Sequence, residues 1–260
     1  MRKYLLIFRL AARDQLIYLP SFLVKNLFFV VLVFVFWSLW RVVFAGRGVI
    51  AGMTLVQTLW YLTFTEAVEL SKSRAMFLVQ QEVKDGTVAI NLSRPYSYVL
   101  FHFFRCMGES FVKTIPILLE GFVLAVLFVG PLPGYAGALP FGFLLILLGV
   151  ALTNLWLLAV GLLAFWTEEV APFYWVIQKL VFILGGLFLP IDIFPAGVAA
   201  VAKYLPFAFC AYWPASTIVN FRPRTFLTGL GGAVVYLVVI GGLAALAYHR
   251  GRRKVGVQGG

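Results

Sequence analysis

Long, nearly uninterrupted apolar stretches constrain this chain more than any other feature of its sequence. The 19 positions from Phe22 to Trp40 include only Lys25, Asn26 and Ser38 as strongly polar residues, and about five comparable stretches follow. A helix needs about 20 apolar residues to cross a bilayer core about 30 Å thick, where no water can satisfy free backbone groups. The sequence therefore predicts an all-α, polytopic membrane protein.

The composition agrees with this class and argues against a nucleic-acid-binding protein. Hydrophobic residues make up 62% of the chain and charged residues 12%, and the mean hydropathy is +0.97. The net charge of +11 suits cytoplasmic loops and anionic lipid headgroups, since the chain offers no basic soluble surface. Six spans of about 22 residues leave no stretch for a soluble domain, so we predict a single transmembrane domain over residues 1–260.

Six transmembrane helices are predicted, preceded by one amphipathic helix. The predicted spans cover residues 22–44, 49–70, 107–130, 141–166, 173–189 and 226–248. Within residues 1–20, Arg2, Arg9 and Arg13 share one helical stripe. A basic stripe opposite apolar residues predicts a helix that lies at the membrane interface.

Two longer segments between the spans have patterns of their own. Residues 71–105 form the longest polar interval, and a brief loop before the fifth span carries Glu168 and Glu169. These are the candidate places for a cytoplasmic partner to dock. Residues 190–224 are interrupted by prolines yet remain apolar, which predicts short re-entrant helices on the outer side.

Basic residues are distributed unevenly between the two sides of this topology. Thirteen lie on the side of the termini: Arg2, Lys3, Arg9, Arg13, Lys72, Arg74, Lys84, Arg94, Arg105, Arg250, Arg252, Arg253 and Lys254. Five lie on the other side: Arg41, Arg47, Lys203, Arg222 and Arg224. Because cytoplasmic loops carry the excess of lysine and arginine, we predict a multi-pass protein of the inner (cytoplasmic) membrane with both termini cytoplasmic. Cys106 and Cys210 then lie on opposite sides and cannot form an intrachain disulfide bond.

No motif for catalysis or for metal or nucleotide binding occurs in the sequence. The only histidines are His102, expected on an interfacial helix face, and His249 in the basic C-terminal stop. There is no H-E-x-x-H, no paired cysteine ligand set, no G-x-S-x-G and no P-loop. We therefore expect no catalytic residue, no metal site and no cofactor bound by this chain.

The third predicted span carries a polar stripe. Glu109, Lys113 and Glu120 are spaced by four and seven residues, which places them on one helical face. A charge near the middle of the membrane costs about 2.5 to 3.5 kcal/mol, so these side chains should face protein or a water-filled path. Two interpretations stay open: the stripe lines a translocation path together with Asn154, or Glu120 bonds a neighbouring helix, for instance through Asn154 or Thr153.

Two segments resemble the membrane subunits of ABC-2 type transporters, the permease half of a class of ATP-binding cassette exporters. Residues 81–88 (QEVKDGTV) and 92–95 (LSRP) are similar to a cytoplasmic E-x-x-x-G and L-x-R-P pattern of one branch of that family. Residues 185–190 (GGLFLP), followed by Phe-Pro at 194–195 and Leu-Pro at 205–206, resemble the end of its fifth span and its outer re-entrant helices.

The resemblance implies an exporter assembled from two permease subunits and two ATPase subunits. ATP and Mg would be bound by the partner ATPase, and the path would lie between this chain and a second permease, identical or related. The residues implied in ATPase coupling are Gln81, Glu82, Asp85, Gly86, Arg94, Pro95, Glu168 and Glu169. Gly86 would permit a tight turn and Pro95 would start the next helix, so that residues 75–94 act as a rigid lever.

The substrate implied is an amphipathic or lipid-like molecule, a drug or a polymer. One alternative is a channel or an ATP-independent scramblase, which would need no cytoplasmic motor. A second is a membrane-embedded enzyme that uses Glu120 or Glu66 as a base, but no accompanying nucleophile is evident in the sequence.

Overall fold

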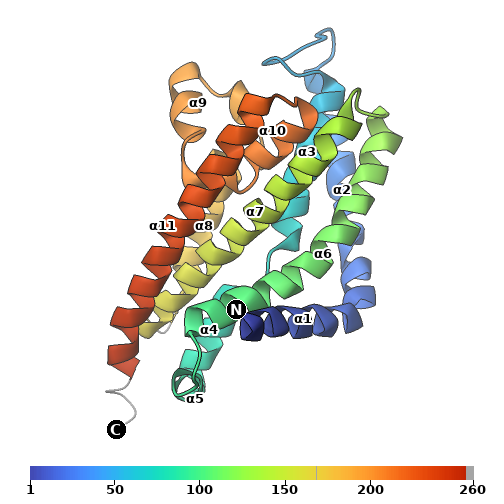
Figure 1. Ribbon diagram of the computed structural model, residues 1–260. Helices are drawn as coiled ribbons and strands as arrows, with labels where there is room; N and C mark the ends of the chain where they lie inside the picture. Colours follow the sequence, from blue (N-terminus) through green and yellow to red (C-terminus); the bar gives the residue numbers. More distant parts are fainter. Residues whose placement is uncertain (168, 256–260) are drawn as a thin grey trace.

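The computed structural model describes residues 1–167 and 169–255, which form helices and no β-strand. Four of the described helices are long and apolar enough to cross a membrane. They are α2 (Leu19–Val43), α6 (Tyr98–Val129), α7 (Tyr135–Gly161, continued by the 3₁₀ helix η1, Leu162–Phe165) and α11 (Pro223–Val255). Figure 1 shows that α6, α7 and α11 run through the length of the molecule, with α2 along one side.

Two further helices coincide with predicted spans but are shorter. α3 (Leu55–Ser71) has 17 residues and α8 (Ala171–Leu184) has 14, so by length and apolarity the described residues give four spans where six were predicted. Both helices are shorter than their apolar runs for local reasons. Thr54 and Gln57 cap the start of α3 with reciprocal hydrogen bonds, and α8 ends just before Gly186 turns the chain at φ +72°.

The short helix α3 lies at the centre of the bundle. Its side chains Leu59, Trp60, Tyr61 and Leu62 are fully buried. The polar atoms of its aromatic residues find partners: Trp60 Nε1 donates to the carbonyl of Gly130 at 3.0 Å, and Tyr61 Oη donates to that of Gly186 at 2.7 Å. Because buried N–H and O–H groups need such partners, these bonds hold α3 against the ends of α6 and α8.

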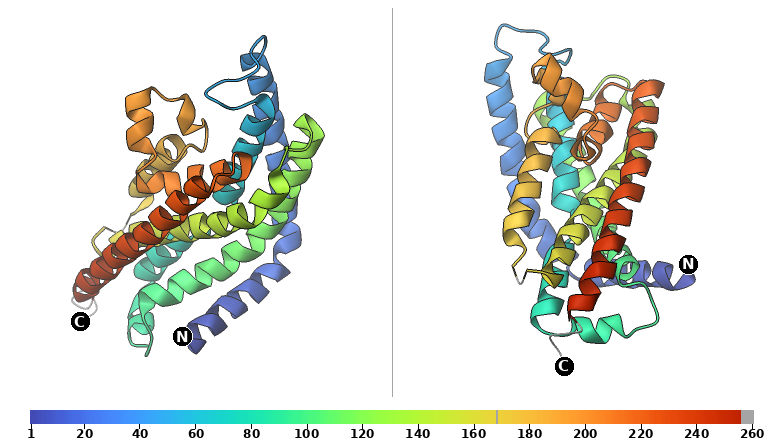
Figure 2. Two further views of the ribbon diagram at one scale, coloured as in Figure 1. Left: turned by 45° about the horizontal axis from the view of Figure 1, so that its top comes forward. Right: turned by 90° about the vertical axis from the view of Figure 1, so that its left-hand side faces the viewer.

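The N-terminal helix α1 (Arg2–Ile17) lies across one end of the bundle (Figures 1 and 2). It packs along the first half of α6, where Tyr4 stacks on Phe104 with ring centroids 5.6 Å apart. The two backbones approach closely at Gly108, where an added Cβ would lie 2.3 Å from the carbonyl oxygen of Phe8. Only glycine permits this contact between α1 and α6.

The polar interval between α3 and α6 is not one continuous helix. It forms two short helices, α4 (Ala75–Lys84) and α5 (Val88–Leu92), and Gly86 makes the predicted tight turn between them at φ +72°. Pro95 does not start the next helix. α6 begins at Tyr98, because the Ser97 side chain accepts a hydrogen bond from Leu100 N and caps the helix there.

Residues 190–224 contain four short helical pieces: η2 (Ile191–Ile193), α9 (Ala196–Ala202), η3 (Pro206–Phe209) and α10 (Tyr212–Val219). α10 is buried against α3 and α7. Asp192 ties these pieces together, since its Oδ1 lies 2.6 Å from Lys203 Nζ and accepts a hydrogen bond from Tyr212 Oη at 3.1 Å. These short helical pieces are therefore joined by a polar network.

The two ends of the bundle differ in what they carry. α1, α4, α5 and the C-terminal end of α11 gather at one end, and α9 and the connection from α2 to α3 lie at the other (Figures 1 and 2). The elements that hold the larger set of basic residues are thus grouped together. Cys106 and Cys210 are both buried and free.

Candidate functional site

The end of α4 presents a polar rim at the end of the bundle where α1 lies. Gln81 Nε2 donates to both carboxylate oxygens of Asp85, at 2.8 and 2.9 Å, one helical turn along. Both side chains are exposed, as is the turn at Gly86. These three predicted coupling residues therefore face outward and are accessible to a partner.

Glu169 is brought to the same rim from the loop before α8. Its Oε2 lies 2.9 Å from Lys84 Nζ, and its Oε1 accepts a hydrogen bond from Gln80 Nε2 at 3.0 Å. Hydrogen bonds from Lys84 and from the backbone of Ala171 hold the pKa of Glu169 below its usual value. The sequence showed both segments as polar but carried no signal that Lys84 and Gln80 would join them. Glu168 lies outside the described residues.

Glu82 is turned inward, unlike its neighbours on α4. Its Oε2 accepts a hydrogen bond from Tyr98 Oη at 2.7 Å and lies 3.3 Å from His102 Nε2. Burial acts to raise the pKa of Glu82, but the contact with His102 and the hydrogen bond from Tyr98 outweigh it and hold the pKa below its usual value. Glu82 therefore links α4 to the first turns of α6. His102 is fully buried beneath this contact and not on an interfacial face as predicted, because α4 folds back over it.

Residues 93–97 connect the same region to α1. The carbonyl of Pro95 accepts a hydrogen bond from Lys3 Nζ at 3.0 Å, and Tyr4 Oη accepts one from Ser97 N at 3.0 Å. Arg94 is exposed, and its guanidinium donates to Tyr96 Oη at 3.1 Å. Movement of this segment would therefore act on α1 as well as on α6.

We name the exposed part of this region the coupling surface. It consists of Gln81, Lys84, Asp85, Gly86, Ile90, Arg94, Pro95 and Glu169. The surface carries charges of both signs and one exposed large apolar side chain, Ile90, which is 61% accessible. Exposed polar groups of this kind can form the polar rim of a surface that binds another protein.

The predicted polar stripe on α6 is divided among different contacts. Glu109 and Lys113 form an ion pair one turn apart. Glu120 accepts a hydrogen bond from Asn26 Nδ2 of α2. The partner of Glu120 is therefore Asn26, and not Asn154 or Thr153, because α2 packs against this face of α6.

Asn154 has a different surrounding from the rest of the stripe. It is buried, its Oδ1 accepts a hydrogen bond from Ser73 N at 2.9 Å, and its Nδ2 donates to Ser110 Oγ at 2.8 Å. A buried amide with these partners joins α7 to α6 and to the link between α3 and α4. Asn154 therefore holds α7 against these two segments through hydrogen bonds.

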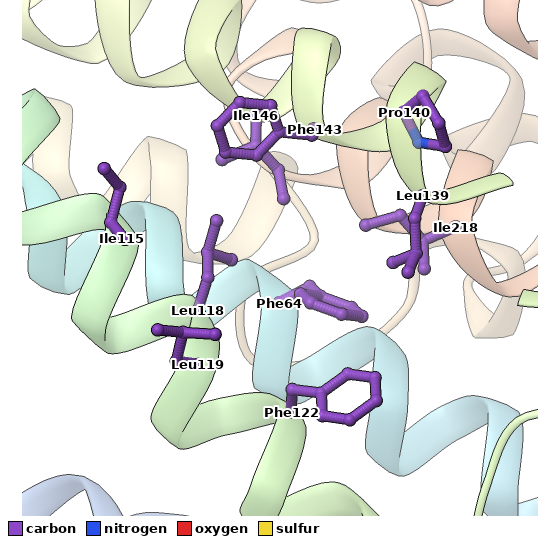
Figure 3. Close-up of a pocket in the computed structure, with 10 residues that line it drawn as sticks. All are labelled: Phe64, Ile115, Leu118, Leu119, Phe122, Leu139, Pro140, Phe143, Ile146 and Ile218. Carbon is purple, nitrogen blue, oxygen red and sulfur yellow. The ribbon is translucent and has the colours of Figure 1, made fainter. Parts of the chain in front are cut away.

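Two cavities lie near these groups. One of about 390 Å³, called the polar cavity below, has a mixed lining in which apolar side chains alternate with Asn26 of α2, Lys113 of α6 and the link that carries Lys72 and Arg74. An entirely apolar one of about 530 Å³ lies between α3, α6, α7 and α10, as Figure 3 shows. In that view Phe64 and Phe122 form one wall and Phe143 and Ile146 face them.

The chain matches one family model in a comparison with known protein families. The family model described as ABC-2 family transporter protein matches residues 15–259. The match begins near the end of α1 and includes α4, α5 and the helices from α6 to α11. No curated protein matches the chain.

Proposed function

Because this chain belongs to the ABC-2 family of transporter membrane proteins, we propose that it is the permease subunit of an exporter driven by a separate ATPase. The working assembly would contain two ATPase subunits, which bind ATP and Mg, and a second permease subunit that is identical or related. The chain itself would carry no catalytic residue.

The proposed topology has six spans, with α3 and α8 as the second and the fifth. At 1.5 Å per residue, 17 residues reach about 25 Å and 14 residues about 21 Å. Both fall short of a hydrocarbon core about 30 Å thick, but neither helix is isolated. Most residues of α3 are buried inside the protein, and the apolar residues 185–189 extend the chain beyond α8. Irregular backbone next to these helices, at the depth of the membrane, would therefore be enclosed by protein.

The proposed orientation places α1, α4, α5 and the end of α11 on the cytoplasmic side of the inner membrane. It is supported by the thirteen basic residues of this end against five at the other. α1 would then lie along the inner membrane surface, and α9 and α10 would be the outer re-entrant helices.

One observation carries the coupling proposal: Glu169 is bonded to Lys84 and Gln80. The two segments that the sequence marks as docking places form one surface, so one ATPase subunit can contact both at once. Movement of α4 would reach α6 through Glu82 and Tyr98. We place the translocation path beside the polar cavity that Lys113 and Asn26 line.

The test is to purify the chain from its native membrane and to identify what accompanies it. We expect an ATPase subunit to co-purify, and Asp85→Lys to lower that ATPase's activity in the complex, since the reversed charge lies in the coupling surface. Asp14→Lys, the same change at an exposed position on α1, is the matched control and should leave the activity unchanged. Purification without any ATPase, or lipid or ion movement across vesicles that hold the chain alone without ATP, would favour the channel or scramblase instead.

A further inference from the structure

A cleft of about 760 Å³ separates the first turns of α6 from the part of α11 between Val234 and Arg252. Its wall on α11 is a continuous stripe, because Val234, Leu237, Val238, Gly241 and Ala245 recur at helical spacing. Leu155 of α7 also lines it. None of the residues discussed above as part of the coupling surface lines this cleft.

The cleft changes character along its length. The part near Val234 is apolar, whereas the part near the end of α11 is lined by Tyr96, Ser97, His249 and Arg252. None of the described residues that line it is acidic. The polar part lies at the end of the bundle that holds α4 and α5 (Figure 1), where α11 would leave the membrane.

Gly241 gives the cleft its depth. A Cβ at this position would make only an ordinary contact, 3.7 Å from Leu155 Cδ2, so the missing side chain leaves space that nothing else fills. Gly242 is exposed, faces open space and does not line the cleft. The two adjacent glycines therefore form a matched pair for experiment.

The positive charge at the polar end of the cleft is carried by Arg252, whose guanidinium can bind an anion. Arg252 is exposed, and its guanidinium lies over the ring of Tyr248, 5.9 Å from the centroid. The carboxylate of Glu82, which approaches this region through Tyr98, is already engaged by Tyr98 and His102. Tyr98 stacks on Tyr248 with ring centroids 5.5 Å apart, so these two rings link Glu82 to Arg252. Among the described residues no acidic side chain forms a salt bridge with Arg252, so its guanidinium is free to bind an anion.

We propose that this cleft binds one anionic phospholipid, with an acyl chain between α6 and α11 and the phosphate at Arg252 and Ser97. Val234 and Arg252 are 18 residues apart, about 27 Å along the helix. One leaflet with its headgroup layer measures about 20 to 22 Å, so the cleft is long enough for both parts of the lipid. The bound lipid would join α11 to residues 96–97. The proposal does not depend on the ATPase or on the transported substrate.

Binding is measured on the detergent-purified chain by native mass spectrometry with phosphatidylglycerol and with phosphatidylcholine. We expect the protein to retain phosphatidylglycerol preferentially, and Arg252→Gln to lower that preference roughly 10-fold, because a charge-assisted phosphate contact is lost. Arg250→Gln and Arg253→Gln remove the same charge from the same helix end outside the cleft. An equal loss in these controls would reduce the effect to a general basic surface and overturn the proposal.

The apolar part is tested with the two glycines. Gly241→Leu should weaken binding of both lipids severalfold by filling the cleft, while Gly242→Leu should bind as the unmodified protein does. Equal binding by the two variants would overturn the proposal. Glycerol phosphate in excess should not displace the lipid, since it lacks an acyl chain; displacement would point to a free phosphate site. Self-crosslinking of Val238→Cys through α11, with no retained lipid, would assign the cleft to a second copy of the chain.

Discussion

Lys84 Nζ lies 2.9 Å from Glu169 Oε2, although the two residues are 85 positions apart in the sequence. This ion pair joins α4 to the loop before α8 and brings the two polar segments of one end of the bundle into one surface. Both side chains are substantially exposed, 41% and 54%, and exposed pairs contribute little to stability. The main effect of the ion pair is therefore to hold the two segments together, so that one partner can contact both.

A charge swap tests this relationship. Lys84→Glu and Glu169→Lys should each lower the ATPase activity of the purified complex, because like charges would separate α4 from the loop. The double variant restores opposite charges and should recover most of the activity. The melting temperature should change little in all three. Full activity in both single variants would show that the pair does not support docking.

The inward contact of Glu82 predicts a pH dependence. Its pKa is below the usual value in the folded chain, so the contact stabilises the protein above the unfolded pKa of about 4.3, and this stabilisation is lost as the pH falls through the lower folded value. Glu82→Gln should lower the stability by about 1 to 2 kcal/mol at pH 7 and flatten the decline of the melting temperature below pH 5. Asp14→Asn, exposed on α1, is the control. If the melting temperature of Glu82→Gln fell below pH 5 as steeply as that of the unmodified protein, Glu82 would not be the group responsible for the pH dependence.

The contact of α1 with α6 depends on the missing side chain of Gly108. Gly108→Ala would place a Cβ 2.3 Å from the carbonyl oxygen of Phe8, so α1 and α6 must move apart. We expect the free energy of unfolding to fall by about 1 to 3 kcal/mol. Gly137→Ala in α7 meets nothing within 4 Å and should be neutral or slightly stabilising. Thermal unfolding of both variants in detergent makes the comparison. Similar melting temperatures would mean that α1 does not hold this position in solution.

The hydrogen bond between Asn26 and Glu120 can be tested with a double-mutant cycle that compares folded yields. Glu120→Gln should fold normally, because its side-chain oxygen can still accept from Asn26 Nδ2. Asn26→Leu leaves the carboxylate without this donor and should lower the folded yield, whereas adding Glu120→Leu should restore it. Yield is measured by size-exclusion chromatography. If Glu120→Gln folds but abolishes transport, the charge belongs to the path; unchanged transport would remove Glu120 from it.

Topology is tested with introduced cysteines, since Cys106 and Cys210 are buried. An impermeant thiol reagent outside intact cells should label Val198→Cys in α9 and leave Ala89→Cys in α5 unlabelled until the membrane is opened. Both positions are exposed. The reverse pattern would invert the proposed orientation, and the unmodified protein provides the background.

Local sequence patterns predicted the membrane class, the resemblance to the ABC-2 family, the polar segment with its turn at Gly86 and short helices after residue 190. These follow from local properties: apolar runs, helical periodicity, and glycine and proline positions. A span's exact length was less accessible, because the ends of α3 and α8 depend on a cap and on a turn.

The partners of the polar side chains depend on how the helices pack in three dimensions. The tertiary structure turned Glu82 inward to Tyr98, paired Glu120 with Asn26 and brought Glu169 to Lys84. Each of these pairs joins separate elements, so helical spacing within either element carries no information about it. The partner of a polar side chain inside a helical bundle is set by which helices pack together and at what height, because burial leaves each group dependent on the nearest donor or acceptor that packing supplies.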